Sequence, residues 1–375
     1  MTEIYLIRHT QAEGNLYRMM QGHWDGNVTA LGWRQIEALS KRFETVHVDA
    51  VYASDLYRTR MTATAITEPH GLPLHTEPAL REIHLGRWET GFFANIAAEE
   101  PEQMAAFIRD PDRWSLEGAE TYADVAARAY PALEEIARRH EGQVVAVVSH
   151  GVTIRCLLAR ITGRPLSGAN PLPIGGNTSV SRLIWDKGGF TADYINDKSH
   201  LDALQLPAWG STADLRDEIF DPATDKAYYT ACYENAWRSV HGSVKGFNAQ
   251  TYYDAALRHH KEHPGAVLKL YNKDEPVGLV DLDTRRGAHA NYGWVSLLYL
   301  KPEYRQKGYG VQVLARAVRL YRNLGRKAIR LHVSPDNTAA LTFYKRQGFA
   351  LLSEDGSGGS RLLLMEKKLG GPEDA

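Results

Sequence analysis

The sequence has few cysteines, no excess of either charge and no long apolar run. Its two cysteines, Cys156 and Cys232, argue against a disulfide framework or a cysteine-ligated zinc site and favour a reducing compartment. Lysine and arginine total 44 against 45 acidic residues, and this near-neutral balance argues against the large basic face that general nucleic-acid binding requires, although it leaves a local basic patch open. No apolar run approaches the ~20 residues of a membrane span, and residues 1–7 lack the basic start of a secretory signal. We expect a cytoplasmic protein that binds neither membranes nor nucleic acid.

The length of 375 residues predicts two domains, at ~100–200 residues for each. The content of 43% hydrophobic and 24% charged residues is ordinary for a globular protein. It excludes collagen, a coiled coil and disorder as descriptions of the whole chain. Proline and glycine interrupt the apolar pattern between residues 202 and 225. We expect a first domain over 1–205, a linker or domain edge over 206–224, a second domain over 225–369 and a disordered tail over 370–375.

Short apolar runs alternate with helical patterns in the first half. Strands are predicted over residues 2–7, 50–54 and 143–149. Helices are predicted between them, over residues 30–43, 56–68, 95–108 and 121–140. The third run is apolar on both faces, which is typical of a central strand covered by helices. Alternating strands and helices indicate an α/β fold with a mostly parallel sheet.

Polar side chains follow each of these strands, at the edge where open α/β sheets bind their ligands. Arg8 and His9 end the first strand, His150 ends the third, and Arg58 lies in the helix after the second. A neutral imidazole can attack phosphorus, and guanidinium groups bind the phosphoryl oxygens and stabilise their charge. The leaving oxygen needs an acid, for which Glu82 is the best candidate. The pattern indicates phosphoryl transfer through a histidine.

The first half resembles the histidine phosphatase superfamily, the branch with cofactor-dependent phosphoglycerate mutase and broad-specificity phosphatases, over residues 2 to about 195. The matching pieces occur in family order: Arg8-His9-Thr10 with Asn15, Gln21-Gly22, Thr29-Ala30-Leu31-Gly32, Ser54 to Arg58, Glu82 with Gly86 and Trp88-Glu89, Glu117-Gly118-Ala119-Glu120, and Ser149-His150-Gly151. The chain departs from the family at Thr10 and Thr90, where glycine is usual. These departures leave the charge-bearing groups in place and the substrate preference open.

The resemblance implies a three-layer α/β/α domain of the phosphoglycerate mutase type, with His9 as nucleophile and Glu82 as proton donor. It implies Arg8, Arg58 and His150 as the rest of the phosphate pocket. The expected contacts to the phosphoryl or leaving group are Asn15, Gln21 and Gly22, with Arg81 added because it adjoins the acid. Neither a metal nor a cofactor is implied. We expect hydrolysis of a small phosphorylated metabolite, since acidic residues dominate between Glu82 and Glu120; a mutase-type activity is the alternative.

The second half has a different pattern. Helices are predicted near residues 225–240 and 250–262, from 309 and from 337. Strands are predicted near 265–271, 276–284, 291–301, 327–333, 349–353 and 361–367. A loop with Gly308 and Gly310 joins the third of these strands to a helix. Glycines let backbone amides approach a phosphate, and the start of a helix adds positive potential.

A second block completes this pattern: a strand ending at Val333, Asn337 as a helix cap, Tyr344, and Gly348-Phe349. Together the two blocks resemble the GNAT N-acetyltransferase superfamily, an α+β fold that binds acetyl-CoA, from about 225 to 367. The resemblance implies Tyr344 as proton donor to the departing thiolate. The implied cofactor contacts are Leu298, Leu300, Arg305, Gln306, Lys307, Gly308, Tyr309, Gly310 and Asn337.

The acceptor implied for this half is a small amine or amino-acid-like molecule. The sequence leaves the general base open among Asp281, Asp283, Ser296 and a water molecule. We therefore carry two hypotheses for the chain. It is a bifunctional phosphatase and N-acetyltransferase, or it is a phosphatase whose second domain only binds or senses acetyl-CoA.

Overall fold

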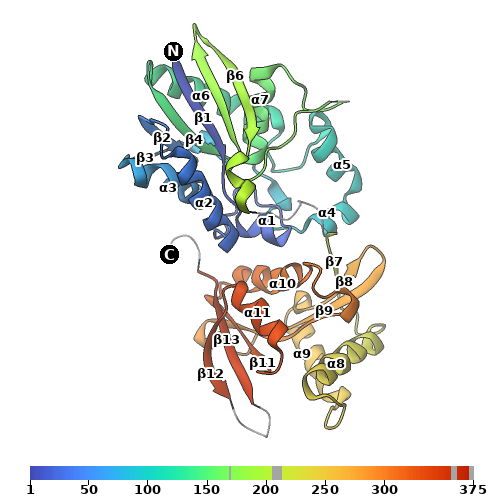
Figure 1. Cartoon of the computed structure of the whole chain (residues 1–375). Helices are drawn as coiled ribbons and strands as arrows, with labels where there is room; N and C mark the ends of the chain where they lie inside the picture. The colour runs from blue at the N-terminus through green and yellow to red at the C-terminus, as the bar shows by residue number, and fades with distance from the viewer. Residues whose placement is uncertain (169, 205–212, 356–360, 371–375) are drawn as a thin grey trace. The chain divides into compact units, whose positions relative to one another are not determined.

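The computed structural model describes residues 1–168, 170–204, 213–355 and 361–370, in two compact units, Met1–Trp209 and Gly210–Ala375 (Figure 1). The expected domain boundary at residue 205 and the expected disordered tail, apart from Gly370, lie outside the described residues. Within the described part of the chain, no helix combines the length and hydropathy needed to cross a membrane.

The first unit alternates strands and helices (Figure 1). Its elements are β1 (Thr2–Arg8), α1 (Glu13–Tyr17), α2 (Ala30–Phe43), β2 (Ala50–Ala53), α3 (Tyr57–His70), β3 (Leu74–Thr76), α4 (Phe93–Glu99), α5 (Pro101–Arg109), α6 (Tyr122–Arg139), β4 (Val144–Ser149), α7 (Gly151–Thr162), β5 (Val180–Asp186) and β6 (Gly189–Asp197). The single helix predicted over 95–108 is wrong. Pro101 cannot donate a hydrogen bond back into α4 and instead occupies the first turn of α5.

Six strands form one sheet in the order β3-β2-β4-β1-β5-β6. The first four run parallel, and β5 and β6 extend the sheet antiparallel. β4 is flanked by β2 and β1, which confirms the predicted central strand. The sequence analysis missed β3, β5 and β6. β3 has only three residues and β6 is a half-exposed edge strand, so neither has a strong apolar signal.

Helices cover both faces of this sheet and make three layers, as predicted. Ile7 faces a core formed with Leu39 of α2 and Ile66 of α3. Its neighbour Leu6 faces the opposite core, formed with Leu157 of α7 and residues of α6. Neighbouring residues in a strand point to opposite faces, so an uninterrupted apolar strand supplies both cores.

Helix α6 begins where the sequence predicted, because its first turn is closed by a reciprocal pair of bonds. Thr121 Oγ1 accepts a hydrogen bond from the Asp124 N–H at 3.1 Å, and the Asp124 carboxylate accepts the Thr121 N–H at 2.8 Å. This capping box fixes the start of the helix that carries Arg128.

The second unit is built around a larger, mostly antiparallel sheet (Figure 1). Its elements are β7 (Arg216–Ile219), α8 (Lys226–His241), α9 (Ala249–Glu262), β8 (Val267–Asn272), β9 (Glu275–Asp283), β10 (Tyr292–Leu300), α10 (Gly310–Asn323), β11 (Ala328–Val333), α11 (Thr338–Arg346), β12 (Ala350–Asp355) and β13 (Leu362–Lys368). The strand order is β12-β13-β11-β10-β9-β8-β7, and β10 with β11 is the one parallel pair among these described strands. This arrangement agrees with the expected α+β fold.

Strand β7 lies inside the stretch that the sequence analysis assigned to a linker. It pairs antiparallel with β8 at the edge of the second sheet. Its sequence, Arg216-Asp217-Glu218-Ile219, is charged and therefore lacks the apolar alternation of a strand. Charged edge strands are common, because they discourage pairing with other chains. The sequence analysis did not predict this strand within the linker or domain edge, because the apolar signal of a strand is absent.

Candidate active sites

The register of the first sheet brings the two histidines together. β1 and β4 are parallel, with Arg8 directly beside Ser149. His9 and His150 follow these residues, and their ring centroids lie 5.2 Å apart with the planes inclined at 54°. Their meeting at one sheet edge is a direct result of the parallel pairing.

The imidazole of His9 is fixed in one tautomer by its neighbour. His9 is 2% exposed, and its Nδ1 lies 2.6 Å from the carbonyl oxygen of Thr10. A carbonyl only accepts hydrogen bonds, so Nδ1 carries the hydrogen and Nε2 keeps its lone pair. Asn177 Nδ2 donates to the carbonyl of His9 at 3.0 Å and holds the main chain. Nε2 is therefore the atom available for nucleophilic attack.

Both histidines are neutral near neutral pH. Burial, followed by the charges of Arg58 and Arg8, lowers the pKa of His9 well below 6.5, although the bond to Thr10 opposes this. Burial, followed by Arg58 and His9, lowers the pKa of His150 in the same way. A nucleophilic imidazole must be unprotonated, so these surroundings suit that role.

Buried polar atoms without partners cluster at this sheet edge. Among the described residues, Arg8 Nε, Arg58 Nε, His150 Nδ1 and Gln21 Oε1 are buried and make no hydrogen bond. His150 Nε2 lies 2.8 Å from Ser54 Oγ; when that hydroxyl donates, Nδ1 carries the hydrogen. The Gln21 amide can turn to present its NH2 group. Buried polar groups are normally satisfied, so this set of donors indicates a site for an anion.

Backbone carbonyls orient the two arginines. Arg8 NH1 donates to the Gly175 carbonyl at 2.5 Å. Arg58 is fully buried; its NH2 donates to the Gly22 carbonyl at 2.7 Å, and its NH1 lies 3.3 Å from Asp25 Oδ1. Burial lowers the pKa of each arginine, which is the cost of holding a desolvated cation. Carbonyl dipoles orient the guanidinium group of Arg8, and Arg58 is held by a carbonyl together with the carboxylate of Asp25.

Glu82 is held at the start of α7, the helix that follows His150. Its carboxylate accepts hydrogen bonds from the N–H groups of Val152 at 3.1 Å and Thr153 at 3.2 Å. The carboxylate also interacts electrostatically with Arg8 and Arg58, so the predicted acid shares a site with two of the residues predicted to bind phosphate.

The other predicted phosphate contacts lie around α1. Asn15 Oδ1 accepts the N–H of Ala12 at 3.0 Å, at the start of that helix. Gln21 packs on Gly14 so closely that a Cβ there would lie 2.0 Å from Gln21 Cγ. Gly22 has φ +52°, and an added Cβ would lie 2.3 Å from a carboxylate oxygen of Glu89, so both requirements favour glycine.

Arg81 has a different environment from the other predicted contacts. Its guanidinium binds the carboxylate of Asp55 through two nitrogens, with Nε–Oδ1 at 2.7 Å. The side chain is 37% exposed. A substrate group would have to compete with Asp55 for this cation.

In the second unit, two adjacent strands separate where a cofactor arm was expected. β10 and β11 pair only from Tyr292–Ala328 to Val295–Leu331. Further along, Leu298 and Leu300 pair with β9 on one side, and no described strand pairs with them on the other. A half-paired strand can accept an extended chain as an additional strand.

The loop after β10 has the expected features of an anion site. Gln306 and Gly308 have φ of +59° and +84°, and α10 starts at Gly310. The N–H groups of Gln306 and Gly308 make no backbone hydrogen bond to the described chain. Arg305 Nε donates to the Leu300 carbonyl at 2.9 Å, and Tyr309 packs on Tyr304 with ring centroids 5.8 Å apart. Free amides at a helix start fit a pyrophosphate; Lys307 lies in the same loop and is exposed.

Asn337 and Tyr344 lie at opposite ends of α11. Asn337 Oδ1 accepts the Ala340 N–H at 3.1 Å, which confirms the predicted cap. The Tyr344 ring contacts Phe343 and Phe349, with centroids 5.3 and 5.2 Å away. Burial raises the pKa of Tyr344 to about 12, so the phenol keeps its proton at neutral pH.

The possible bases have unequal access to solvent. Asp281 is 1% exposed and binds the Tyr229 hydroxyl and His259 Nδ1, each at 2.6 Å. Asp283 lies 3.4 Å from His259 Nε2. Ser296 lies at a bulge in β10, between residues paired with β9, and its carbonyl accepts the Tyr233 hydroxyl at 3.3 Å. Asp281 is thus engaged in a buried network rather than presented to a substrate.

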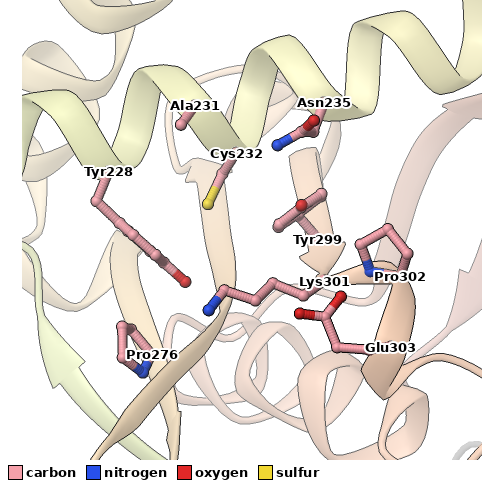
Figure 2. Close-up of a pocket in the computed structure, with 9 residues that line it drawn as sticks. All are labelled: Tyr228, Ala231, Cys232, Asn235, Pro276, Tyr299, Lys301, Pro302 and Glu303. Atoms are coloured by element: carbon pink, nitrogen blue, oxygen red, sulfur yellow. The ribbon is translucent and has the colours of Figure 1, made fainter.

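A cavity of about 370 Å³ lies beside α8 and the ends of β9 and β10 (Figure 2). Its lining residues are Tyr228, Ala231, Cys232, Asn235, Pro276, Tyr299, Lys301, Pro302 and Glu303. The last two directly precede the loop with Gln306 and Gly308 in sequence. Within the described residues, no cluster of three potential metal ligands occurs in either unit.

Comparison with known proteins identifies both units. Residues 4–198 match the histidine phosphatase superfamily (branch 1). The chain belongs to the histidine phosphatase superfamily. Residues 227–349 match the acetyltransferase (GNAT) family, so a GNAT domain is fused after the phosphatase domain.

Relatives of this histidine phosphatase cover about half of the chain. Two proteins named probable phosphoglycerate mutase GpmB, from Enterobacter sp. (strain 638) and Yersinia enterocolitica, are each 30% identical over 211 residues, which are 55% of this chain and 98% of the relative. The solved structure of Bacillus stearothermophilus YhfR has 34% identity and a TM-score of 0.52, covering 54% of this chain and all of that one. These similarities support the assignment of the domain to this superfamily and do not identify its substrate.

Several residues of the phosphatase site were not singled out by sequence reasoning. Ser54 was part of a family motif without a role, and Asp25, Asn177 and Arg128 were not recognised. Asn177 precedes β5. Because the sequence analysis did not predict this strand, the loop that carries Asn177 could not be placed at the edge of the sheet. Arg128 lies on a helix where a charged residue usually faces water. No local signal marks such contacts, because they join segments distant in sequence.

Proposed function

We propose that the phosphatase domain hydrolyses small phosphate monoesters through a phosphohistidine at His9. The observation that carries this proposal is the combination of a free Nε2 on His9 with unsatisfied donors on Arg8, Arg58 and His150. We assign this domain to residues 1–205. The two free, buried cysteines fit a reducing cytoplasm.

The reaction proceeds in two steps. His9 Nε2 attacks phosphorus, the P–O bond to the alcohol breaks, and protonated Glu82 gives its proton to the leaving oxygen. Water then attacks the phosphohistidine, Glu82 takes a proton from it, and phosphate leaves with His9 neutral again. Arg8, Arg58 and His150 stabilise the charge on the phosphoryl oxygens in both steps. Asn15, Gln21 and Gly22 line the position of the phosphoryl or leaving group.

Simple hydrolysis is favoured over a mutase reaction by the charges near the acid. A mutase must retain an intermediate with a second anionic group, which requires cations free to bind it. Arg81 is bound by Asp55, and Arg87 is bound by Glu100. The relatives named as probable phosphoglycerate mutases keep a mutase-type activity as the alternative.

A phosphate-release screen over phosphorylated metabolites, with the His9→Ala chain as blank, tests this proposal. We expect release by the unchanged chain and none by His9→Ala. His47→Ala is the matched control, because that histidine is 78% exposed and pairs with Asp49. Hydrolysis retained by His9→Ala overturns the nucleophile assignment. Transfer of the phosphoryl group to a second hydroxyl, without phosphate release, favours the mutase alternative.

For the GNAT domain, residues 225–369, we propose acetyl-CoA-dependent N-acetylation of a small amine or amino-acid-like acceptor. When bound, acetyl-CoA supplies an activated acetyl group. The amides of residues 306–310 suit its pyrophosphate, with Arg305 and Lys307 adding positive charge, and the half-paired backbone of Leu298 and Leu300 suits its extended arm. The cavity of about 370 Å³ is within the size range of small-molecule sites.

Within this domain, Tyr344 Oη holds a proton that it can give to a thiolate, and Asn337 contacts the cofactor through its free amide NH2. Proton removal from the acceptor falls to an ordered water or to Ser296, since Asp281 and Asp283 are each already bound on both oxygens. The alternative is a domain that binds or senses acetyl-CoA without turnover. Incubation with acetyl-CoA and an amine library, followed by thiol release, distinguishes them; turnover lost in Tyr344→Phe with binding retained supports the donor role.

A further inference from the structure

The main chain that carries Glu82 has no regular structure of its own. It follows a single turn of 3₁₀ helix, Pro78–Leu80, and precedes another at Gly86–Trp88. Residues in such a segment are not positioned by a helix or sheet ladder. Its carbonyl groups must find partners elsewhere, because buried carbonyls are rarely left unpaired.

Those partners come mainly from one side chain, Arg128 of α6. Its NH1 donates to the carbonyls of Ala79 at 2.7 Å and Arg81 at 2.8 Å, and its NH2 donates to the carbonyl of Glu82 at 2.9 Å. A guanidinium has five N–H donors in a rigid plane. Three of them therefore clamp the segment that ends at the acid.

Glu120 occupies the remaining two donors. Arg128 Nε and NH2 donate to its two carboxylate oxygens at 2.6 and 2.8 Å. Glu120 is itself anchored, because it accepts the N–H of His84 at 2.8 Å and its own N–H donates to the His84 carbonyl at 2.9 Å. Burial raises the pKa of Glu120, but the bonds from Arg128 and His84 outweigh burial and lower it, so the pair is ionised.

The carboxyl end of Glu82 is fixed separately, on the N–H groups of Val152 and Thr153. The start of α7 thus holds the carboxylate of the acid, Arg128 holds three carbonyls of its main chain, and the Thr153 hydroxyl shares one of these, the Arg81 carbonyl, at 2.7 Å. His23 Nε2 adds a second bond to the Glu82 carbonyl, at 2.8 Å. Movement of the main chain would draw the carboxyl away from α7 and from the leaving oxygen, and small displacements of a reacting group have large effects on rate.

We infer that Arg128, oriented by Glu120, is a positioning residue for the general acid Glu82. All five N–H groups of Arg128 are taken by the carbonyls of Ala79, Arg81 and Glu82 and by the carboxylate of Glu120, so none is left for a phosphoryl group. The inference rests on the proposed function, since it requires that Glu82 protonates the leaving oxygen. Lysine cannot replace the arginine, because one ammonium with three donors cannot hold three carbonyls and a bidentate carboxylate together.

Leaving-group dependence tests this role directly. Proton donation is needed when a poor leaving group departs and hardly needed when the leaving group is a stable anion. We would measure kcat and KM of the full chain for para-nitrophenyl phosphate, phenyl phosphate and an alkyl phosphate. We expect Arg128→Lys to lower kcat/KM for the alkyl ester roughly 10- to 100-fold, part of the factor a general acid supplies, with a change of less than about 3-fold for the nitrophenyl ester. The ratio kcat/KM is the readout, because it reports formation of the phosphohistidine and excludes the later hydrolysis step, which all three esters share.

Glu120→Gln is the second variant, and it keeps the inference testable if Arg128→Lys does not fold. It should show the same selectivity to a smaller degree. Arg182→Lys is the matched control: Arg182 lies in β5, binds Glu3 at 2.7 Å and has no contact with the segment 79–82. Its effect should be equal for all three esters.

Glu82→Gln separates the two levels of the argument. If Glu82→Gln lowers kcat/KM selectively for the poor leaving group, and both Arg128→Lys and Glu120→Gln lower kcat/KM equally for all esters, the positioning role is overturned and the proposed function stands. If Glu82→Gln itself lowers kcat/KM equally for all esters, the acid assignment is overturned, and the inference falls with it. Selectivity in Glu82→Gln and in either positioning variant supports the inference.

Discussion

The carboxylate of Asp55 binds Arg81 at Nε and at a terminal nitrogen, immediately beside the acid Glu82 in sequence. Hydrogen bonding to Arg81 lowers the pKa of Asp55, so the pair is charged at neutral pH. Both side chains are partly exposed, at 37% and 28%. A cation that could select anionic substrates is thus already paired in the free protein.

Asp55→Asn should therefore change substrate preference. With its partner neutralised, Arg81 becomes available to a second anionic group, and we expect KM for carboxylated or bisphosphorylated esters to fall about 5-fold, as a surface ion pair is worth up to ~1 kcal/mol. KM for para-nitrophenyl phosphate should not change. The double variant Asp55→Asn with Arg81→Ala is the control and should lose the gain. An equal change for neutral and anionic esters contradicts the idea.

His9 should remain neutral well into the acidic range. Its pKa lies well below 6.5, first because it is buried and then because Arg58 and Arg8 are close. Nitrogen NMR of the free protein, with His9→Gln to assign the signals, should show a hydrogen on Nδ1 and a bare Nε2 at pH 6.5, where an ordinary histidine is half protonated. Protonation with a midpoint at or above 6.5, or a hydrogen on Nε2, would contradict the tautomer derived from Thr10.

Gly308→Ala should weaken acetyl-CoA binding. Gly308 has φ +84°, and a residue with a side chain at such an angle costs roughly 1 kcal/mol, so Kd should rise about 5-fold. Gly325→Ala is the matched control: Gly325 has φ +68° in open space at the end of α10, so the strain is similar but lies outside the loop. Calorimetric titration with acetyl-CoA measures both. Equal weakening in the two variants would argue against the amide loop as the binding site.

The network around His259 should make the GNAT domain more stable at low pH than at high pH. Burial lowers the pKa of His259, but bonds to Asp281 and Asp283 outweigh burial and raise it to about 9. A raised folded-state pKa adds stability that is complete below 6.5 and is lost as the pH rises through 9. We expect His259→Gln to lower stability by on the order of 2–3 kcal/mol more at about pH 6 than at about pH 10.

Thermal unfolding of the full chain at the two pH values measures this difference. The transition of the GNAT domain is recognised by its shift on adding acetyl-CoA. His260→Gln is the control, because the described residues include no carboxylate paired with this neighbouring histidine. A pH-independent loss in His259→Gln would show that the ring contributes packing alone.

Much of the architecture was predictable because it is local. α6 follows from Thr121 as cap and an apolar stripe, and β4 follows from five consecutive apolar residues. The sequence predicted one helix in place of α4 and α5. A break at Pro101 alters a single turn and leaves the spacing of the apolar residues on either side almost unchanged. β7 was missed because its edge position is compatible with a charged sequence.

The chemistry of the first site was predictable for a related reason. His9, His150 and Arg58 directly follow strands, and parallel strands in one sheet must end at the same edge. Residue type and strand order therefore placed them together without coordinates. Their ordered occurrence with Glu82 carried the family resemblance, which the match over residues 4–198 confirms.

The sequence by itself determined the two domain types, the strand-end histidines and the glycine loop before α10. Only the tertiary structure decided which partner each charged side chain has. Arg81 is bound by Asp55, Arg128 clamps the main chain of Glu82, and His259 is held between Asp281 and Asp283. The physical reason is range: backbone periodicity is written in neighbouring residues, whereas hydrogen-bond and ion-pair partners are set by the packing of segments far apart in the chain.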